Sequence, residues 1–343
     1  MKRRLFLSAP ATAVATLAAP SVWSQPNTRL TPVKFTLDFR VTGQTSPFFL
    51  ALSKGYYKDE GLDVSIDVGA GSVASITRIA SGVYQMGLGD ISSLVEFNAQ
   101  TPGTPLVQAV YQYYNRAPFA IIGRKDRGIT SDFRSLEGKR IAAAAVESTR
   151  RVWPMVARKA RLKADMFNWV TTDFSARDNV VVRGDVDGAT YFHDSAVSLF
   201  TRMKLDDLSV LQYAQAGVNL YGNAILASNG MVTQSPHTVA AFLRATNHAI
   251  VETLANPAAS IAATRQREPI LDEKTELERW RITAQYVAAA DTQGHGLGDI
   301  RKLYLEQQVD DVVEVFGLKA RPSADGIFNR SMLPAKADRM VRS

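Results

Sequence analysis

The residues best suited to bind a small molecule lie where predicted strands end. Short strands alternate with helices along the chain, and ligands of such open sheets sit at the carboxyl ends of the strands. Polar side chains follow the strands of a first unit, and they recur in a second unit of similar design. The candidates are Asp38, Arg40, Thr42, Gln44, Ser72, Asp90, Glu147, Ser148, Thr149, Arg150, Tyr191, His193, Asn219 and Tyr221.

These side chains fit two kinds of small molecule. Asp38 and Glu147 can accept hydrogen bonds from the amino groups of a heterocycle, while Tyr191 or Trp153 stacks on its ring. Arg40 and Arg150 can instead pair with a sulfonate or a carboxylate. The heterocycle is the favoured interpretation, and the small anion stays open as the alternative.

Several candidates also have a purely structural explanation. Asp90 and Ser72 can cap the helices that follow them. Arg40 can lie on the surface, and Tyr191 can belong to the core. Asp38 lies late in an apolar strand, where a carboxylate needs a partner, and both a ligand and an internal ion pair would serve.

The sequence lacks the motifs of familiar enzymes. It has no phosphate loop ending in Gly-Lys-Ser/Thr, no nucleophile elbow and no His-Glu-x-x-His. It has no cysteine, which excludes disulfides, thiolate catalysis and Cys-ligated metals. His193 and Asp194 alone would make an incomplete metal site. We therefore expect a non-catalytic protein with no metal and no cofactor.

The composition is that of a globular protein. The 343 residues are 46% hydrophobic and 21% charged, which allows one large domain or two lobes. The formal net charge is +7, but no basic run is interleaved with aromatic residues. Nucleic-acid binding is therefore not expected.

The N-terminus has the three parts of an export signal over residues 1–25. The bases Lys2, Arg3 and Arg4 precede an apolar stretch at 9–19 that is too short to span a bilayer. The start resembles a twin-arginine signal, although an ordinary Sec signal stays open. No cysteine follows that could carry a lipid. We expect a soluble protein, without a later membrane span, that is exported to the periplasm.

The first unit reads as strand, helix, strand, helix, strand, helix. Its strands are expected at 33–39, 62–68 and 83–88, and its helices begin near Ser46, Ser72 and Asp90. The second unit repeats this order, with strands expected at 141–146, 168–172 and 187–192.

The first helix of the second unit is expected over about 152–161. Pro154 is comfortable at a first helical position, so this helix can also begin only there. Residues 147–153 would then form a long loop whose Trp153 faces a ligand.

Two pairs of strands are expected to cross between lobes. The first pair is 105–113 with 119–123, and the second is 209–213 with 224–227. Asn219, Tyr221 and Asn223 flank Gly222 near the second crossing, where they can serve as hinge, turn or ligand residues. The region after Pro236 reads as helical and should return to the first lobe. The expected division is 33–118 with 225–343 as lobe 1, and 119–224 as lobe 2.

A short internal similarity supports two units of the same design. Residues 81–87 and residues 183–189 each pass from a helix end at a glycine into a strand of small residues. Gly82 and Gly184 are expected to make the same turn in the two lobes.

One run is specific to a known family. Residues 51–64, with Lys-Gly-Tyr-Tyr-Lys-Asp-Glu-Gly-Leu-Asp-Val at 54–64, follow Leu37-Asp38-Phe39. Together they resemble the start of the periplasmic solute-binding proteins of the NMT1/THI5-like and SsuA-like group. The segments 81–90, 136–141 and 186–189 fall in the expected order. The Pro-Asn-x-x-His stretch of the pyrimidine-binding members is replaced here by residues 40–45, and the cysteine-rich motif of the eukaryotic pyrimidine synthases is absent.

The resemblance implies an α/β, two-lobed periplasmic-binding fold of type II, each lobe a mostly parallel sheet flanked by helices. It implies capture of a solute by hinge closure for an ABC importer, with a permease in the inner membrane as partner and a monomer as the expected state. Pyrimidine-like or other aromatic solutes are favoured over anions. An enzyme of pyrimidine metabolism on the same fold, or a sensor subunit, are the rival functions.

Overall fold

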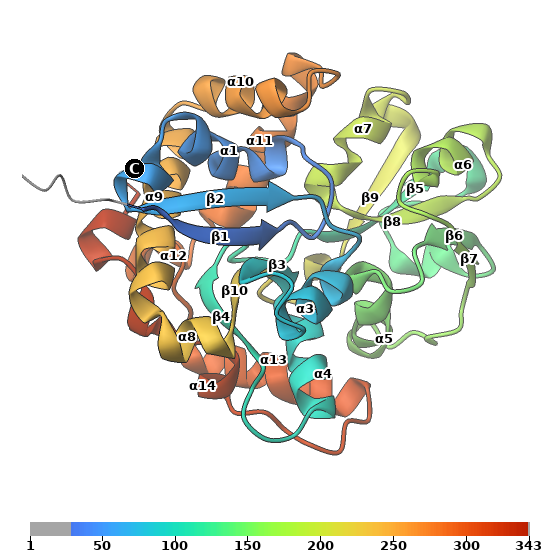
Figure 1. Cartoon of the computed structure of the whole chain (residues 1–343). Coiled ribbons are helices and arrows are strands. Elements are labelled where there is room, and N and C mark those ends of the chain that lie inside the picture. The colour runs from blue at the N-terminus through green and yellow to red at the C-terminus, as the bar shows by residue number, and fades with distance from the viewer. Residues whose placement is uncertain (1–28, 342–343) are drawn as a thin grey trace, which may run out of the picture.

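The structure, a computed structural model, describes residues 29–341 and contains two five-stranded sheets flanked by helices (Figure 1). The first sheet has the order β2 (Leu62–Asp67), β1 (Thr31–Thr36), β3 (Met86–Asp90), β10 (Asn223–Ser228), β4 (Val107–Gln112). The second has the order β7 (Asn168–Thr171), β6 (Arg140–Ala143), β8 (Gly188–Phe192), β5 (Phe119–Arg124), β9 (Leu208–Gln212). The expected export signal at residues 1–25 lies outside the described residues.

The two sheets share one plan. In each, a strand pairs in parallel with two neighbours, β1 with β2 and β3, and β6 with β7 and β8. Each sheet also contains one exchanged strand, which enters directly from the other sheet: β10 follows β9, and β5 follows β4. The exchanged strand runs antiparallel to both of its neighbours. The chain therefore crosses twice between the sheets. The two-lobed α/β class is confirmed, and the exchanged strands make both sheets mixed.

The helices follow the strands in each half and then continue alone. The first half holds α1 (Ser46–Ser53), α2 (Tyr56–Asp59), α3 (Ser72–Ala80) and α4 (Ile91–Gln100). The second holds α5 (Ser148–Lys159), α6 (Arg177–Arg183) and α7 (Val197–Phe200). After β10 come α8 (Asn229–Gln234), α9 (Pro236–Ala255), α10 (Ala258–Arg267), α11 (Glu273–Val287), α12 (Thr292–His295), α13 (Lys302–Val315) and α14 (Ala324–Ile327).

Two of the C-terminal helices pack on elements of the first half. Helix α9 packs on α1 and β2, and α13 packs on α4. The Phe35 ring, on β1, lies 5.0 Å from that of Phe48 and 5.1 Å from that of Phe242 (centroid distances), so α1 and α9 share one aromatic core with the strand. None of the helices within residues 29–341 is both long enough and apolar enough to cross a membrane.

The predicted turns at Gly82 and Gly184 are confirmed. Each glycine ends a helix with a positive φ, 78° and 79°, in the left-handed region that glycine tolerates best. Each turn leads into the third strand of its unit, β3 or β8, which pairs with the first strand. The two similar segments of the sequence therefore form equivalent turns, each before the third strand of its unit.

The prediction for the start of α5 was wrong. The helix begins at Ser148, and Pro154 lies inside it. A proline there removes one backbone hydrogen bond, but the surrounding helix persists because its apolar face is buried. Val152, Trp153 and Val156 lie in the core of the second half, so residues 147–153 do not form a ligand-facing loop.

Candidate functional site

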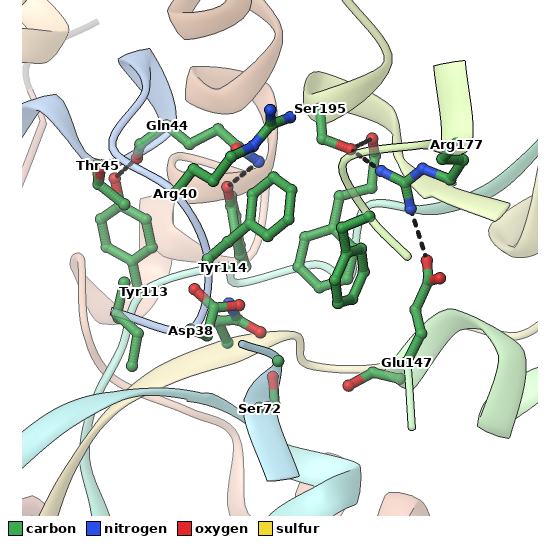
Figure 2. A pocket seen from close by; sticks show the side chains of 17 residues that line it. Asp38, Arg40, Gln44, Thr45, Ser72, Tyr113, Tyr114, Glu147, Arg177 and Ser195 are labelled. Carbon is green, nitrogen blue, oxygen red and sulfur yellow. Dashed lines mark hydrogen bonds and ion pairs between the residues drawn. The ribbon is translucent and has the colours of Figure 1, made fainter. Parts of the chain in front are cut away.

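A pocket lies between the two sheets, at the carboxyl ends of their parallel strands. Figure 2 shows Asp38 and Ser72 on one side of it and Glu147 and Arg177 on the other. The lining residues are Asp38, Phe39, Arg40, Gln44, Thr45, Gly71, Ser72, Leu88, Tyr113, Tyr114, Glu147, Ser148, Phe174, Arg177, Phe192, Ser195 and Asn223.

The loop between β2 and α3 is folded back onto the end of β1. A Cβ on Gly69 would lie 2.0 Å from the carbonyl oxygen of Leu37, so only glycine fits there. Gly71 has a φ of 103° and donates its N–H to the carbonyl of Asp38 at 2.7 Å. This close approach brings the first turn of α3, with Ser72, beside Asp38 in the pocket wall.

Asp38 is the buried acceptor of the first side. Its Oδ2 accepts a hydrogen bond from Asn223 Nδ2 at 2.6 Å. Burial raises the pKa of this carboxyl to about 6, against the lowering effect of that hydrogen bond. The buried Oδ1 of Asn223 has no hydrogen-bond partner among residues 29–341. Asp38 and Asn223 thus place acceptors in the pocket that a solute with N–H groups could satisfy.

Asp90 lies behind this wall and caps α4. Its Oδ1 accepts from the backbone N–H of Ser93 at 3.0 Å, so the predicted capping role is confirmed. The other oxygen, Oδ2, has no partner in the described part of the chain. Burial raises the pKa of Asp90 to about 7, and the nearby Asp38 contributes to this rise. Asp90 is absent from the pocket lining.

The second side is built around a buried ion pair. Arg177 Nη1 lies 3.1 Å from Glu147 Oε1, and both side chains are less than 5% exposed. Glu147 Oε2 also accepts from Thr190 at 2.9 Å and from the N–H of Ala144 at 3.1 Å. The Arg177 guanidinium lies 4.0 Å from the ring centroid of Tyr191. Arg177 is therefore neutralised and held in place before any solute binds.

Aromatic side chains from both sheets complete the wall. Phe39 follows β1 and Phe174 follows β7, and their rings meet edge to face at 5.1 Å across the cleft. Tyr113, Tyr114 and Phe192 add further ring surface at the crossing between the lobes. Such walls suit a flat ring.

Six of the predicted site residues line the pocket. They are Asp38, Arg40, Gln44, Ser72, Glu147 and Ser148. Ser72 is the first residue of α3 and not its cap, because Gly71 occupies the capping position. Thr42 stands directly behind the lining and donates to Gln44 Oε1 at 3.0 Å.

The structure places the remaining candidates away from the lining. Arg150 donates to Thr171 at 3.0 Å and covers the ring of Trp169. Thr149 is fully buried, and its carbonyl accepts from Tyr213. Their positions on α5 follow from the early start of that helix, which turns both side chains away from the cleft.

The other four candidates lie in the core or near the crossings. Tyr191 is fully buried and donates to Asp178 at 2.8 Å. His193 shares a hydrogen bond with Tyr286. Asn219 accepts from Arg116, and Tyr221 accepts from the N–H of Arg301. Each of these four side chains therefore has a hydrogen-bond partner within the protein and needs no solute to satisfy it.

Several lining residues are not among the candidates predicted from the sequence. Phe174 and Arg177 follow the end of β7, which the strand-end rule could have included. Tyr113 and Tyr114 follow β4 at the first crossing, where strand ends also converge. For Asn223, beside Gly222, the sequence predicts a hinge, turn or ligand role without deciding among them.

The lining combines hydrogen-bonding side chains with aromatic rings. Among the lining residues there is no His, Lys or Cys. Within residues 29–341 no cluster of three or more His, Cys, Asp or Glu side chains could hold a metal ion. The arrangement can accept and donate hydrogen bonds and can enclose a ring.

Comparison with known proteins decides the family. The model of the NMT1/THI5-like family matches residues 42–260. The chain belongs to this family. The match confirms the resemblance seen around residues 51–64, and it spans both sheets of the structure.

Two curated relatives match over most of the chain. A 4-amino-5-hydroxymethyl-2-methylpyrimidine phosphate synthase of Aspergillus parasiticus is 26% identical over 250 residues, covering 70% of this chain and 71% of that protein. The riboflavin-binding protein RibY of Chloroflexus aurantiacus is 26% identical over 295 residues, covering 80% of each chain.

Solved structures share the fold. The ligand-binding component of an ABC-type import system from Staphylococcus aureus is 12% identical, with a TM-score of 0.66, over 88% of this chain and 97% of that one. The alkanesulfonate-binding protein SsuA of Xanthomonas axonopodis, bound to MOPS, is 15% identical, with a TM-score of 0.65, over 88% and 99%. At these identities the likeness concerns the fold.

Proposed function

We propose that this protein is the extracytoplasmic solute-binding subunit of an ABC importer. It captures a pyrimidine-like or related heterocyclic solute in the pocket between two lobes. Lobe 1 comprises residues 33–118 with 225–343, and lobe 2 comprises residues 119–224. The lobes close about the two crossings, and the closed form is stabilised because a solute touches both walls at once.

The observation that carries the solute class is the Asp38–Asn223 pair. One N–H of Asn223 Nδ2 is bonded to Asp38, which leaves acceptor positions on the Asp38 carboxylate and on Asn223 Oδ1, together with the second N–H of Asn223. A ring bearing an amino group or a ring N–H would satisfy these acceptors, and the aromatic wall would cover its faces. The names of both curated relatives fit this interpretation, because riboflavin also contains a pyrimidine-type ring.

A small anion is the second candidate. Arg40 and the first turn of α3 at Ser72 favour it, and the SsuA structure was solved with a sulfonate. Against it stand two buried carboxylates, Asp38 and Glu147. Glu147 pairs with Arg177, so the positive charge in the enclosed part of the pocket is already balanced by a carboxylate.

Synthase chemistry is the rival suggested by the name of the Aspergillus relative. The lining holds no His, Lys or Cys that could act as nucleophile, base or donor. Of its carboxylates, Glu147 is paired with Arg177, and Asp38 accepts from Asn223 through one oxygen. The geometry therefore supports binding better than turnover.

Calorimetric titration with aminopyrimidines, flavins, sulfonates and nitrate tests the solute class. We expect a heterocycle to bind, and Asp38→Asn to weaken its binding about tenfold to a hundredfold, the effect of a hydrogen bond to a charged group. Asp67→Asn is the matched control, because Asp67 ends the neighbouring strand β2 outside the lining. Binding of sulfonates alone, with full affinity in Asp38→Asn, would overturn the heterocycle.

The cellular part of the proposal is that the protein is exported to the periplasm, works as a monomer and delivers its solute to a membrane permease. Deletion of the gene should abolish uptake of the radiolabelled solute by intact cells. Unchanged uptake in the deletion strain would contradict the importer role while leaving solute binding intact.

A further inference from the structure

Helix α11 packs against pocket-forming segments from both halves of the molecule. On one side it contacts the short helix Gly43–Thr45, and on the other it contacts the short helix His193–Ala196 and α7. Gln44 and Thr45 line the pocket from the first segment, and Ser195 lines it from the second. A helix more than 70 residues beyond these segments in the chain therefore lies against both.

A buried ion pair on α11 holds the first segment. Glu276 Oε2 accepts the backbone N–H of Gly43 at 2.5 Å and the Nε–H of Arg279 at 2.9 Å. Both side chains of the pair are at most 5% exposed. A Cβ on Gly43 would lie 2.5 Å from the carbonyl oxygen of Glu276, so the loop can approach this closely only because the residue is glycine.

The same arginine holds the second segment. Arg279 Nη1 donates to the carbonyl oxygens of Asp194 at 2.9 Å and Ser195 at 3.1 Å. One guanidinium therefore ties residues of lobe 2 to the carboxylate that fixes Gly43 in lobe 1. Charged donors make stronger hydrogen bonds than neutral ones, especially away from water.

The Asp194 carboxylate reinforces this tie. It belongs to lobe 2, yet it accepts from Gln44 Nε2 at 2.7 Å, from the Tyr114 hydroxyl at 2.6 Å and from the Thr283 hydroxyl at 2.9 Å. All three donors belong to lobe 1. Asp194 is fully buried, so opening the lobes at this point would separate its carboxylate from its partners.

We propose that Glu276, Arg279, Thr283 and Asp194 form an interlobe latch that keeps the solute-free protein largely closed and slows the release of a bound solute. Arg279 is a positioning residue, since it is absent from the pocket lining and acts through Gly43, Asp194 and Ser195. The effect on solute release rests on the proposed function. The closure of the solute-free protein does not.

The test measures the distance between the lobes without any solute. Because the chain has no cysteine, Lys58→Cys and Lys204→Cys can be labelled at one exposed position in each lobe. Double electron–electron resonance should show a longer and broader distance distribution in Arg279→Lys than in the otherwise native sequence. Thr283→Val, which removes one hydroxyl with little change of shape, should shift it in the same direction but less.

Arg339→Lys is the matched control. Arg339 is also buried and donates to the backbone carbonyls of Pro334, His295 and Leu297, all within lobe 1. It should lower the melting temperature without changing the distance. With a solute in hand, Arg279→Lys should raise the dissociation rate about tenfold, as expected for weakened charged hydrogen bonds, and barely change the association rate.

An unchanged distance distribution in both Arg279→Lys and Thr283→Val would overturn the latch. So would a shift of the same size in Arg339→Lys, because it would reveal general loosening. Failure of the proposed function gives a different result: no solute would bind to the native protein, whatever the distance measurement shows.

Discussion

Two buried carboxylates, Asp38 and Asp90, set the electrostatics at the residue scale. Removal from water disfavours their charged forms, and for Asp90 the repulsion from Asp38 adds to this cost. Asp38 faces the pocket, where a solute that donates hydrogen bonds can stabilise its charged form. Asp90 caps α4 outside the pocket lining, so the energetic cost of burying its charge is the same with and without a solute.

Solute affinity should depend on the charge of Asp38. Its pKa of about 6 means that only about a tenth of the empty protein carries the ionised carboxylate at pH 5. A neutral heterocycle with N–H donors should therefore bind up to about tenfold more tightly at pH 7.5 than at pH 5. Titrations of the native protein and Asp38→Asn at both pH values check this, and equal pH dependence in the two would contradict the assignment.

Stability should depend on the charge of Asp90 in the opposite sense. The pKa of this carboxyl is about 7 in the folded protein, against an ordinary value of 3.8, so between these values the folded protein holds a proton that the unfolded chain has lost. The free energy of unfolding therefore falls as pH rises through this window. Asp90→Asn keeps a good capping residue and removes the charge.

We expect Asp90→Asn to be more stable than the native protein at pH 8, by about 2–4 kcal/mol, and to lose that advantage towards pH 4. Urea unfolding across this pH range measures the difference between the two curves, so other titrating groups cancel. Parallel curves would show that Asp90 does not titrate in the window.

At the scale of elements, sequence patterns predicted the strands well and one helix boundary poorly. Apolar Leu62, Val64 and Ile66 alternate with polar residues, which predicts the strand β2. The structure confirms it, because these three side chains are buried and the residues between them are exposed. Pro154 misled the prediction for α5, since local preference places proline at a helix start. The burial of Trp153 and its neighbours outweighs that preference, and burial depends on segments distant in sequence.

Trp153→Ala should test this account of α5. The ring is 1% exposed, lies 4.7 Å from that of Phe167 and donates its N–H to the carbonyl of Ala164. Truncation should lower the free energy of unfolding by about 3–5 kcal/mol. The folded fraction should keep its preference among solutes; a changed preference, measured by titration at low temperature, would return Trp153 to the site.

At the scale of the whole molecule, the exchange of β5 and β10 joins the lobes and creates the site between them. The strand-end rule found Asp38 and Glu147 because each lies shortly after a strand in its own half. It missed Tyr114, Ser195 and Arg279, whose roles depend on how one half meets the other. That meeting is set by packing across the cleft, which no local pattern in the sequence records.

The central claim is that the protein holds a heterocyclic solute between its lobes. Native mass spectrometry of the protein purified from its own periplasm, before and after denaturation, tests it most directly. We predict a bound mass of one small molecule per chain, released on denaturation and identified as a nitrogen heterocycle. Release of a sulfonate or another small anion in the same amount would contradict the account.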